Sequence, residues 1–266
     1  MLKLINISKT FNPGTVNEKK ALNGISLHLK KGDFATIIGS NGSGKSTTFN
    51  AITGKFFIDS GSIILDDEDI TFETDYKRSK VIGHLFQNPL LGTAPSMSIE
   101  ENMALAYLRA STGDSKYFSS ISKKDKMMIR EQLAMLNMGL EDRLKQPVGL
   151  LSGGQRQALT LLMATMITPK ILLLDEHTAA LDPATEEIVL KLTRDIIKER
   201  NITCLMVTHN MNQALEYGNR ILMMDSGKIV FDVRDEEKSK LTVDDLLRQF
   251  KEKAGKQLDN DRILLS

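Results

Sequence analysis

The chain has 266 residues, and its 35 Lys and Arg against 34 Asp and Glu leave a formal net charge of +1, so no global field favours nucleic acid or an anionic membrane surface. Its single cysteine excludes a disulfide framework, and residues 1–10 lack the apolar core of a signal peptide. No apolar run approaches the roughly 18 residues that a membrane-spanning helix needs, so we expect a cytoplasmic protein that reaches a membrane only through a partner.

Short β-rich runs open the sequence at residues 2–8, 24–29 and 33–39, with turn-forming segments between them. The third run leads directly into a glycine-rich loop, after which a helix is expected from about Lys45 to a stop at Gly54. Residues 60–70 are typical of a hairpin strand, and residues 79–87 of a further strand.

Residues 98–168 differ in character, because they are rich in Met, Leu, Ala, Lys and Glu and contain few β-branched residues. This composition predicts several helices inserted within an α/β domain. Four methionines, Met127, Met128, Met135 and Met138, are expected in one of these helices. We interpret them as irregular core filling rather than a partner-binding surface.

Strand-like runs resume at residues 170–176, 201–209 and 219–232, and helical stretches follow at 183–200 and 211–217. The first two runs are nearly all apolar, as expected of buried parallel strands. This alternation predicts a parallel sheet with helices on both faces. Beyond about Val233 the chain is strongly charged, and residues 241–253 are expected to form one amphipathic helix.

The glycine-rich loop matches G-x-x-x-x-G-K-[ST] between a predicted strand and a predicted helix. Its glycines let the backbone turn sharply and approach phosphates closely, and successive N–H groups at a helix N-terminus form an anion nest. The Lys45 ammonium suits the β- and γ-phosphates, and the Ser46 hydroxyl suits Mg²⁺. We therefore expect ATP and Mg²⁺ to be bound here, by Gly39, Ser40, Asn41, Gly42, Ser43, Gly44, Lys45, Ser46 and Thr47.

Two carboxylates, Asp175 and Glu176, follow the apolar run 171–174. Ligands of open α/β sheets bind beyond the carboxyl ends of the strands, so both carboxylates should face the nucleotide. We expect Asp175 to hold Mg²⁺ and Glu176 to polarise the attacking water as the catalytic base.

Residues 151–159, LSGGQRQAL, contain an S-x-x-Q capping box in which Ser152 and Gln155 open a helix. Capping does not explain Gly153 and Gly154 in the first turn, because each glycine costs about 1 kcal/mol against alanine. Paired glycines are reasonable if a phosphate approaches this helix N-terminus closely.

With these three motifs the sequence resembles the ATP-binding subunits of ABC transporters, over about residues 1–232, leaving 233–266 as a charged, partly helical extension. The resemblance implies an α/β fold: a P-loop NTPase core, an N-terminal antiparallel β subdomain, and an inserted α-helical subdomain at about 98–168 that carries the signature LSGGQ. The whole chain, and especially residues 175–183, resembles the ATP-binding subunit of a group of bacterial amino-acid importers assigned to tryptophan and tyrosine.

The resemblance also implies roles for single residues. Phe11 would stack on adenine with Val16 beside it, although by sequence alone Phe11 fits a core position equally well. Gln87 would contact Mg²⁺ or water. Asp182 would be the D-loop aspartate, and it also fits a helix cap before a proline.

His209 would contact the γ-phosphate and take part in catalysis with Lys45 and Glu176. His177 adjoins Glu176, where most relatives have proline, and it competes for the same role. We prefer His209 because it ends a predicted buried strand.

Members of this family act as head-to-tail dimers, so the resemblance implies that one copy's Ser152, Gly153, Gly154, Gln155 and Asp182 act on the ATP of a second copy. It further implies that this chain lies on the inner face of the membrane, held there by transmembrane permease subunits, with an extracytoplasmic solute-binding protein in the complex and no nucleic acid. An exporter ATPase and a non-transport ABC ATPase remain alternatives. A DNA-repair relative would need a long coiled coil, and no sustained heptads occur.

Overall fold

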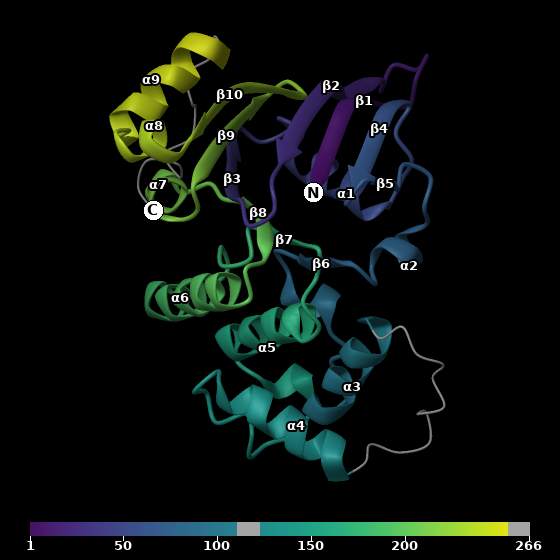
Figure 1. Ribbon diagram of the computed structural model, residues 1–266, viewed down its shortest axis with the longest axis vertical. Coiled ribbons are helices and arrows are strands. Elements are labelled where there is room, and N and C mark those ends of the chain that lie inside the picture. The colour runs from purple at the N-terminus through teal and green to yellow at the C-terminus, as the bar shows by residue number, and fades with distance from the viewer. Residues whose placement is uncertain (111–122, 255–266) are drawn as a thin grey trace. The chain divides into compact units, whose positions relative to one another are not determined.

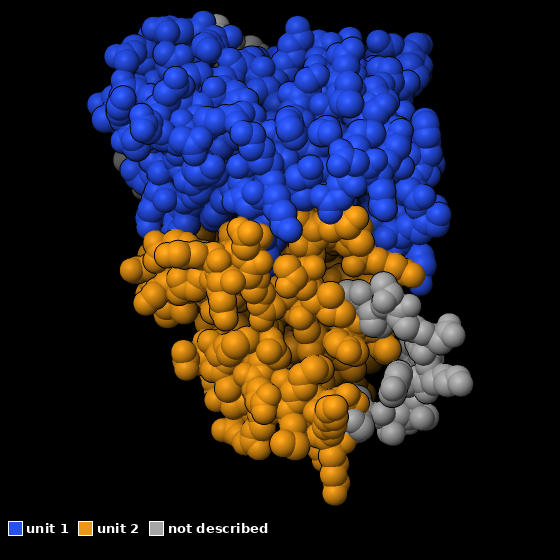
Figure 2. Space-filling model, in the orientation of Figure 1, with its two compact units in different colours: residues 1–78, 202–266 blue, residues 79–201 orange. Residues whose placement is uncertain are grey.

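The structure is a computed structural model that describes residues 1–110 and 123–254 (Figure 1). It forms two compact units, which are coloured separately in Figure 2. The first comprises residues 1–78 and the described part of 202–266, and the second comprises residues 79–201. Within the described ranges, no helix is long and apolar enough to cross a membrane.

An antiparallel sheet occupies the N-terminal part of the first unit. Strand β1 (Leu2–Phe11) lies between β2 (Lys19–Leu29) and β4 (Ser60–Leu65), and the short β5 (Glu68–Asp69) pairs with β4. Leu2 and Leu4 of β1 are buried, and so are their partners Leu29 and Leu27 on β2. The predicted antiparallel β subdomain is confirmed, but β2 begins five residues earlier than the expected run at residue 24.

A second, largely parallel set of strands follows in the same unit. Strand β3 (Phe34–Gly39) pairs in parallel with both β8 (Thr203–Val207) and β9 (Arg220–Asp225), and β10 (Lys228–Arg234) is antiparallel to β9. Every residue of β3 and β8 is buried, which accounts for their continuous apolar sequence.

The helices of the first unit are α1 (Lys45–Thr53), α2 (Asp75–Arg78), α7 (Met211–Glu216), α8 (Asp235–Ser239) and α9 (Val243–Ala254). Gly54 ends α1 in a left-handed conformation, as predicted. Leu246 and Phe250 of α9 share a buried cluster with Met211 and Ala214 of α7. The expected boundary between 232 and 233 falls inside β10, and residues 255–266 lie outside the described chain.

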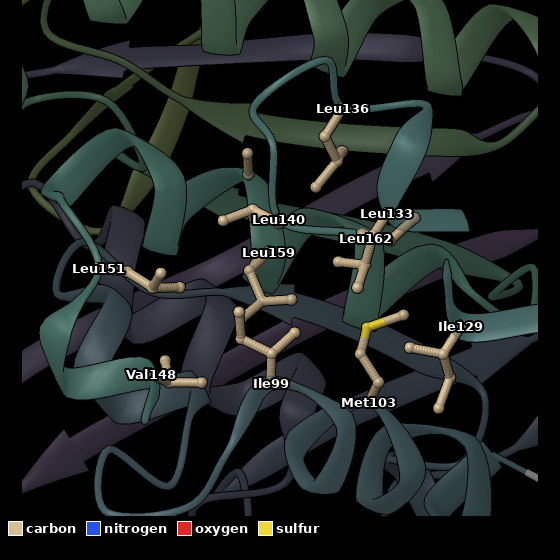
Figure 3. Close-up of a cluster of buried hydrophobic side chains, with 11 residues drawn as sticks. Ile99, Met103, Ile129, Leu133, Leu136, Leu140, Val148, Leu151, Leu159 and Leu162 are labelled. Carbon is tan, nitrogen blue, oxygen red and sulfur yellow. The ribbon is translucent and has the colours of Figure 1, made fainter. Parts of the chain in front are cut away.

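The second unit is mainly helical around one parallel strand pair, β6 (Ile82–Leu85) with β7 (Ile171–Asp175). Its helices are α3 (Ile99–Ala110), α4 (Lys123–Ala134), α5 (Gly153–Thr165) and α6 (Pro183–Glu199), with short 3₁₀ turns η1 (Pro89–Gly92) and η2 (Val148–Leu150). Figure 3 shows their core, in which Met103 of α3, Leu133 of α4 and Leu159 of α5 belong to one buried cluster.

The expected core role of the methionines is wrong for two of the four. Met127 is 65% exposed and Met135 is 42% exposed, whereas Met138 packs partly against the helical core. Helix α4 ends at Ala134, so Met135 and Met138 lie beyond it rather than within it. Composition indicated a helical region, but not which face of α4 is buried.

Candidate functional site

The phosphate loop lies where the motif predicts it, between the end of β3 at Gly39 and the start of α1 at Lys45. Gly44 precedes the helix with φ 108°, and a Cβ there would lie 2.8 Å from the carbonyl oxygen of Ala21. Because an L side chain rarely adopts this conformation and has no room here, glycine is required at this position.

The lining of this loop fits a phosphate group. The buried Lys45 side chain curls over the loop, and its Nζ donates to the carbonyl oxygens of Gly39 at 2.8 Å and Ser40 at 3.1 Å. Ser43 Oγ is buried, and within the described chain it has no hydrogen-bond partner. The first turn of α1 carries no acidic residue, so the N-terminus of this helix offers N–H donors and positive charge to an anion.

The expected adenine contacts lie at the end of β1 and beyond it. Phe11 is half-buried, with its ring edge-on to Phe56 at a centroid distance of 5.2 Å, and Lys9 Nζ lies 5.8 Å from its centroid. Val16 is fully exposed in the following loop. Phe11 is therefore not a core residue, because part of its ring remains accessible to solvent.

Lys19 is a candidate that sequence reasoning missed. It stands opposite Phe11 in the β1–β2 ladder, and its Nζ lies 3.6 Å from the position that a Cβ on Gly42 would occupy. The ammonium therefore lies beside the phosphate loop. Sequence reasoning missed Lys19 because it expected the strand to begin at residue 24, whereas β2 also includes residues 19–23.

His209 lies at the carboxyl edge of the strands that also deliver the phosphate loop. It follows β8, which pairs with β3 in the register Ile37 to Val207. Asn210 then caps α7, where its side chain accepts from the N–H groups of Asn212 and Gln213. The strand end and the capped helix thus hold the half-buried His209 between two fixed points.

Gln87 and Glu176 meet in the second unit. Glu176 directly follows β7 with a left-handed φ of 46°, and Gln87 follows the adjacent strand β6. Gln87 Nε2 donates to Glu176 Oε2 at 3.2 Å. The two side chains come together because β6 and β7 are parallel and end at the same edge, with Asp175 as the last residue of β7.

The segment after Glu176 is anchored to α6. Asp182 caps that helix, since its carboxylate accepts from Thr185 N at 3.1 Å, and the hydrogen bonds from Thr185 lower the pKa of Asp182. Thr178 Oγ1 donates to Glu186 Oε1 at 2.8 Å. The predicted capping by Asp182 is confirmed.

The capping box of the signature is also confirmed, because Ser152 Oγ accepts from Gln155 N and Gln155 Oε1 accepts from Ser152 N, both at 3.2 Å. Ser152 and Gly153 are exposed at the start of α5. Gly154 is buried, and a Cβ there would lie 2.1 Å from Thr185 Cγ2. Close packing of α5 on α6 therefore requires this glycine, a reason that sequence reasoning missed.

Comparison with known proteins agrees with these motifs. Residues 22–179 match the family model described as ABC transporter. The chain is 43% identical over 255 residues to a tyrosine transport ATP-binding protein of Clostridioides difficile, covering 94% of this chain and 98% of that one. It is 33% identical to a phosphonates import ATP-binding protein of Lactococcus lactis subsp. lactis, covering 94% and 99% of the two chains.

Solved structures show the same likeness. An ATP-binding cassette in a dimeric post-hydrolysis state, bound to ADP and Pi, matches with a TM-score of 0.75 and 29% identity, over 88% of this chain and 98% of that one. The protein cbiO1 of Clostridium perfringens, part of an ABC transporter complex, matches with a TM-score of 0.73 and 26% identity over 96% and 95%. On its motifs, its fold and these relatives, the chain belongs to the ABC transporter family as an ATP-binding subunit that hydrolyses ATP.

Proposed function

We propose that this chain powers the import of an aromatic amino acid, tyrosine or tryptophan, through separate membrane subunits. The observation that carries this proposal is the 43% identity, over nearly the whole of both chains, to a tyrosine transport ATP-binding protein. The phosphonates import relative covers as much of the chain but at 33% identity, which favours the amino-acid assignment.

The phosphate loop would hold the nucleotide. Residues 39–47 offer backbone N–H groups, the Ser43 hydroxyl and the Lys45 ammonium, which would exchange its bonds to the Gly39 and Ser40 carbonyls for the β- and γ-phosphates. Phe11 would stack on the adenine, with Val16 beside it.

Mg²⁺ would be held by few protein groups. In the residues that the structure describes, no three His, Cys, Asp or Glu side chains gather as a metal cage. Nucleotide-bound Mg²⁺ needs only one or two protein ligands besides phosphates and water, and Ser46, Asp175 and Gln87 supply a hydroxyl, a carboxylate and an amide. When bound, the ion neutralises charge that develops on the phosphates.

Hydrolysis would depend on Glu176 as the base that orients and polarises the attacking water. The amide of Gln87 already bonds its carboxylate at 3.2 Å, which restricts the rotamers available to both side chains. His209 would donate to the γ-phosphate, and Lys45 would stabilise its charge during transfer.

A second copy of the chain would complete each site. The exposed Ser152 and Gly153, followed by Gly154 and Gln155, place a helix N-terminus at the surface, and such an end binds anions. We propose that these residues, with the exposed Asp182, act on the ATP of the partner copy. One similar structure is a dimer of this kind of cassette.

The cargo itself would be bound by other subunits: permeases in the membrane, which would hold this chain on the cytoplasmic face, and an extracytoplasmic solute-binding protein. Reconstitution of this chain in liposomes with candidate permease and solute-binding subunits tests the cargo. We expect tyrosine or tryptophan to stimulate ATP hydrolysis and to accumulate inside. Stimulation by a phosphonate or by methionine, with no response to aromatic amino acids, would refute the assignment.

A further inference from the structure

Glu176 leaves β7 in a strained conformation. Its φ of 46° lies in the left-handed region, where a residue with a long side chain remains only if its surroundings hold it. The bond from Gln87 restrains the carboxylate end of Glu176. At the backbone end, the carbonyl oxygen of Glu176 accepts from Ala179 N at 3.1 Å, and the side chain of the next residue along the chain provides a further restraint.

His177 is buried, with 3% of its surface exposed, and its Nε2 lies 3.2 Å from Oγ1 of Thr193 in α6. Thr193 is also buried, and its hydroxyl donates to the carbonyl oxygen of Val189 at 2.8 Å. A hydroxyl has one proton to give. The imidazole must therefore be the donor to Thr193, which assigns a proton to Nε2. Burial lowers the pKa of His177 to about 4, in agreement with a neutral side chain.

Two consecutive side chains thus tie this segment to α6. His177 bonds Thr193, and Thr178 bonds Glu186 at 2.8 Å. Glu186 and Thr193 are seven residues apart, two helical turns along one face of α6. A 17-residue helix with a hydrophobic face packed inside the unit is a rigid support for the loop.

We propose that His177 is a positioning residue for ATP hydrolysis: its bond to Thr193 fixes the backbone of Glu176, so that the carboxylate remains aimed at the attacking water. This inference rests on the proposed role of Glu176 as the base. It gives His177 a function different from that of His209, the other histidine considered for contact with the γ-phosphate.

Thr193→Val removes the acceptor while leaving the loop sequence unchanged, and His177→Phe removes the donor at similar volume. For each purified variant, ATPase kinetics, ATP affinity by calorimetry and thermal unfolding are measured. Misplacement of a catalytic group by the order of 1 Å costs up to about a hundred-fold in rate. We therefore expect kcat to fall about ten-fold or more in each, with KM and Kd for ATP within about two-fold of wild type.

Two comparisons separate positioning from stability. Thr193→Ser keeps the hydroxyl and should retain wild-type kcat. Thr165→Val makes the same chemical change in α5, where a buried hydroxyl also bonds a helix carbonyl, that of Leu161 at 2.8 Å, and it should leave kcat unchanged. The double variant His177→Phe with Thr193→Val should be no slower than His177→Phe alone, because both changes break one bond.

Unchanged kcat in a folded Thr193→Val, or an equal loss in Thr165→Val, would overturn the proposal. If His177→Phe does not fold, Thr193→Val and Thr193→Ser decide alone. Glu176→Gln is assayed in parallel. Turnover retained there would refute the role of Glu176, whereas an inactive Glu176→Gln beside fully active His177 and Thr193 variants would refute only the positioning role.

Discussion

Lys45 and Lys19 bring two ammonium groups to the phosphate loop from different elements. Lys45 is buried and bonds the loop carbonyls, whereas Lys19 is an exposed strand residue whose Nζ lies beside Gly42. The first is central to the loop and the second is peripheral to it. Replacing each lysine with alanine should therefore weaken ATP binding by a different amount.

We expect Lys19→Ala to weaken ATP binding by about five-fold, equivalent to roughly 1 kcal/mol for an exposed charge–phosphate contact. Lys45→Ala should abolish binding. Lys20→Ala is the matched control, because the adjacent strand residue points to the other face and should bind ATP as the wild type does. Calorimetric titration checks all three. Equal affinities for Lys19→Ala and Lys20→Ala would show that Lys19 does not touch the nucleotide.

The residue-level assignments differ in how far sequence could support them. The phosphate loop and the capping boxes depend on local spacing, so their geometry followed from the motifs. The Lys19 contact depends on where β2 begins, and the need for Gly154 depends on Thr185, which lies 31 residues away. Such long-range contacts leave no local pattern.

At the scale of elements, a buried arginine from a later segment caps the C-terminal end of α1, the helix that follows the phosphate loop. The Arg78 guanidinium donates to the carbonyl oxygens of Ala51 and Ile52 in α1 and also to those of Thr71 and Glu73. It joins the C-terminus of α1 to the segment before the second unit. Nothing in the periodicity around residue 78 indicated this.

Arg78→Met should lower the free energy of unfolding by about 3 kcal/mol, because several carbonyls would be buried without a donor. Arg248→Met removes an exposed ion pair with Asp245 and should change stability by less than about 1 kcal/mol. Urea denaturation of the two variants measures the difference. A loss for Arg78→Met no larger than that for Arg248→Met would mean that the cap is unimportant.

Lys238 performs a similar task at α7, where its Nζ donates to the carbonyl oxygens of Tyr217 and Gly218 at 2.6 Å. Burial lowers the pKa of Lys238 from 10.5 to about 8. Below pH 8 both the folded and unfolded chains carry the proton. Between about 8 and 10.5 the unfolded chain binds it more strongly, so stability gains from rising pH across this window.

The stability of wild type relative to Lys238→Met should therefore increase from pH 7.5 to 9.5, a comparison that cancels contributions from other groups. Chemical denaturation of both proteins at several pH values gives this difference. A difference that is flat, or that falls with pH, would contradict the shifted pKa. In either case the experiment reports on how the C-terminal helices are attached to α7.

At the scale of the whole molecule, the order of strands and helices along the chain was predictable because hydrophobic runs and turn residues mark each one. The parallel sheet followed from the alternation of strands and helices, whereas the antiparallel sheet was expected only from the family resemblance. The exposure of Met127 and Met135 was not predictable, because amino-acid composition indicates a helix but not which of its faces is buried. Completion of the site by a second copy is proposed from Ser152 and Gly153, which are exposed at the N-terminus of α5.

ATP-dependent dimerisation of Glu176→Gln tests the central claim most directly. The variant keeps every proposed ATP contact but lacks the base, so bound ATP should persist and hold two copies together. Size-exclusion chromatography with ATP and Mg²⁺ should show a stable dimer that contains ATP and does not turn over, and a monomer without nucleotide. A variant that binds ATP yet remains monomeric would contradict the shared site.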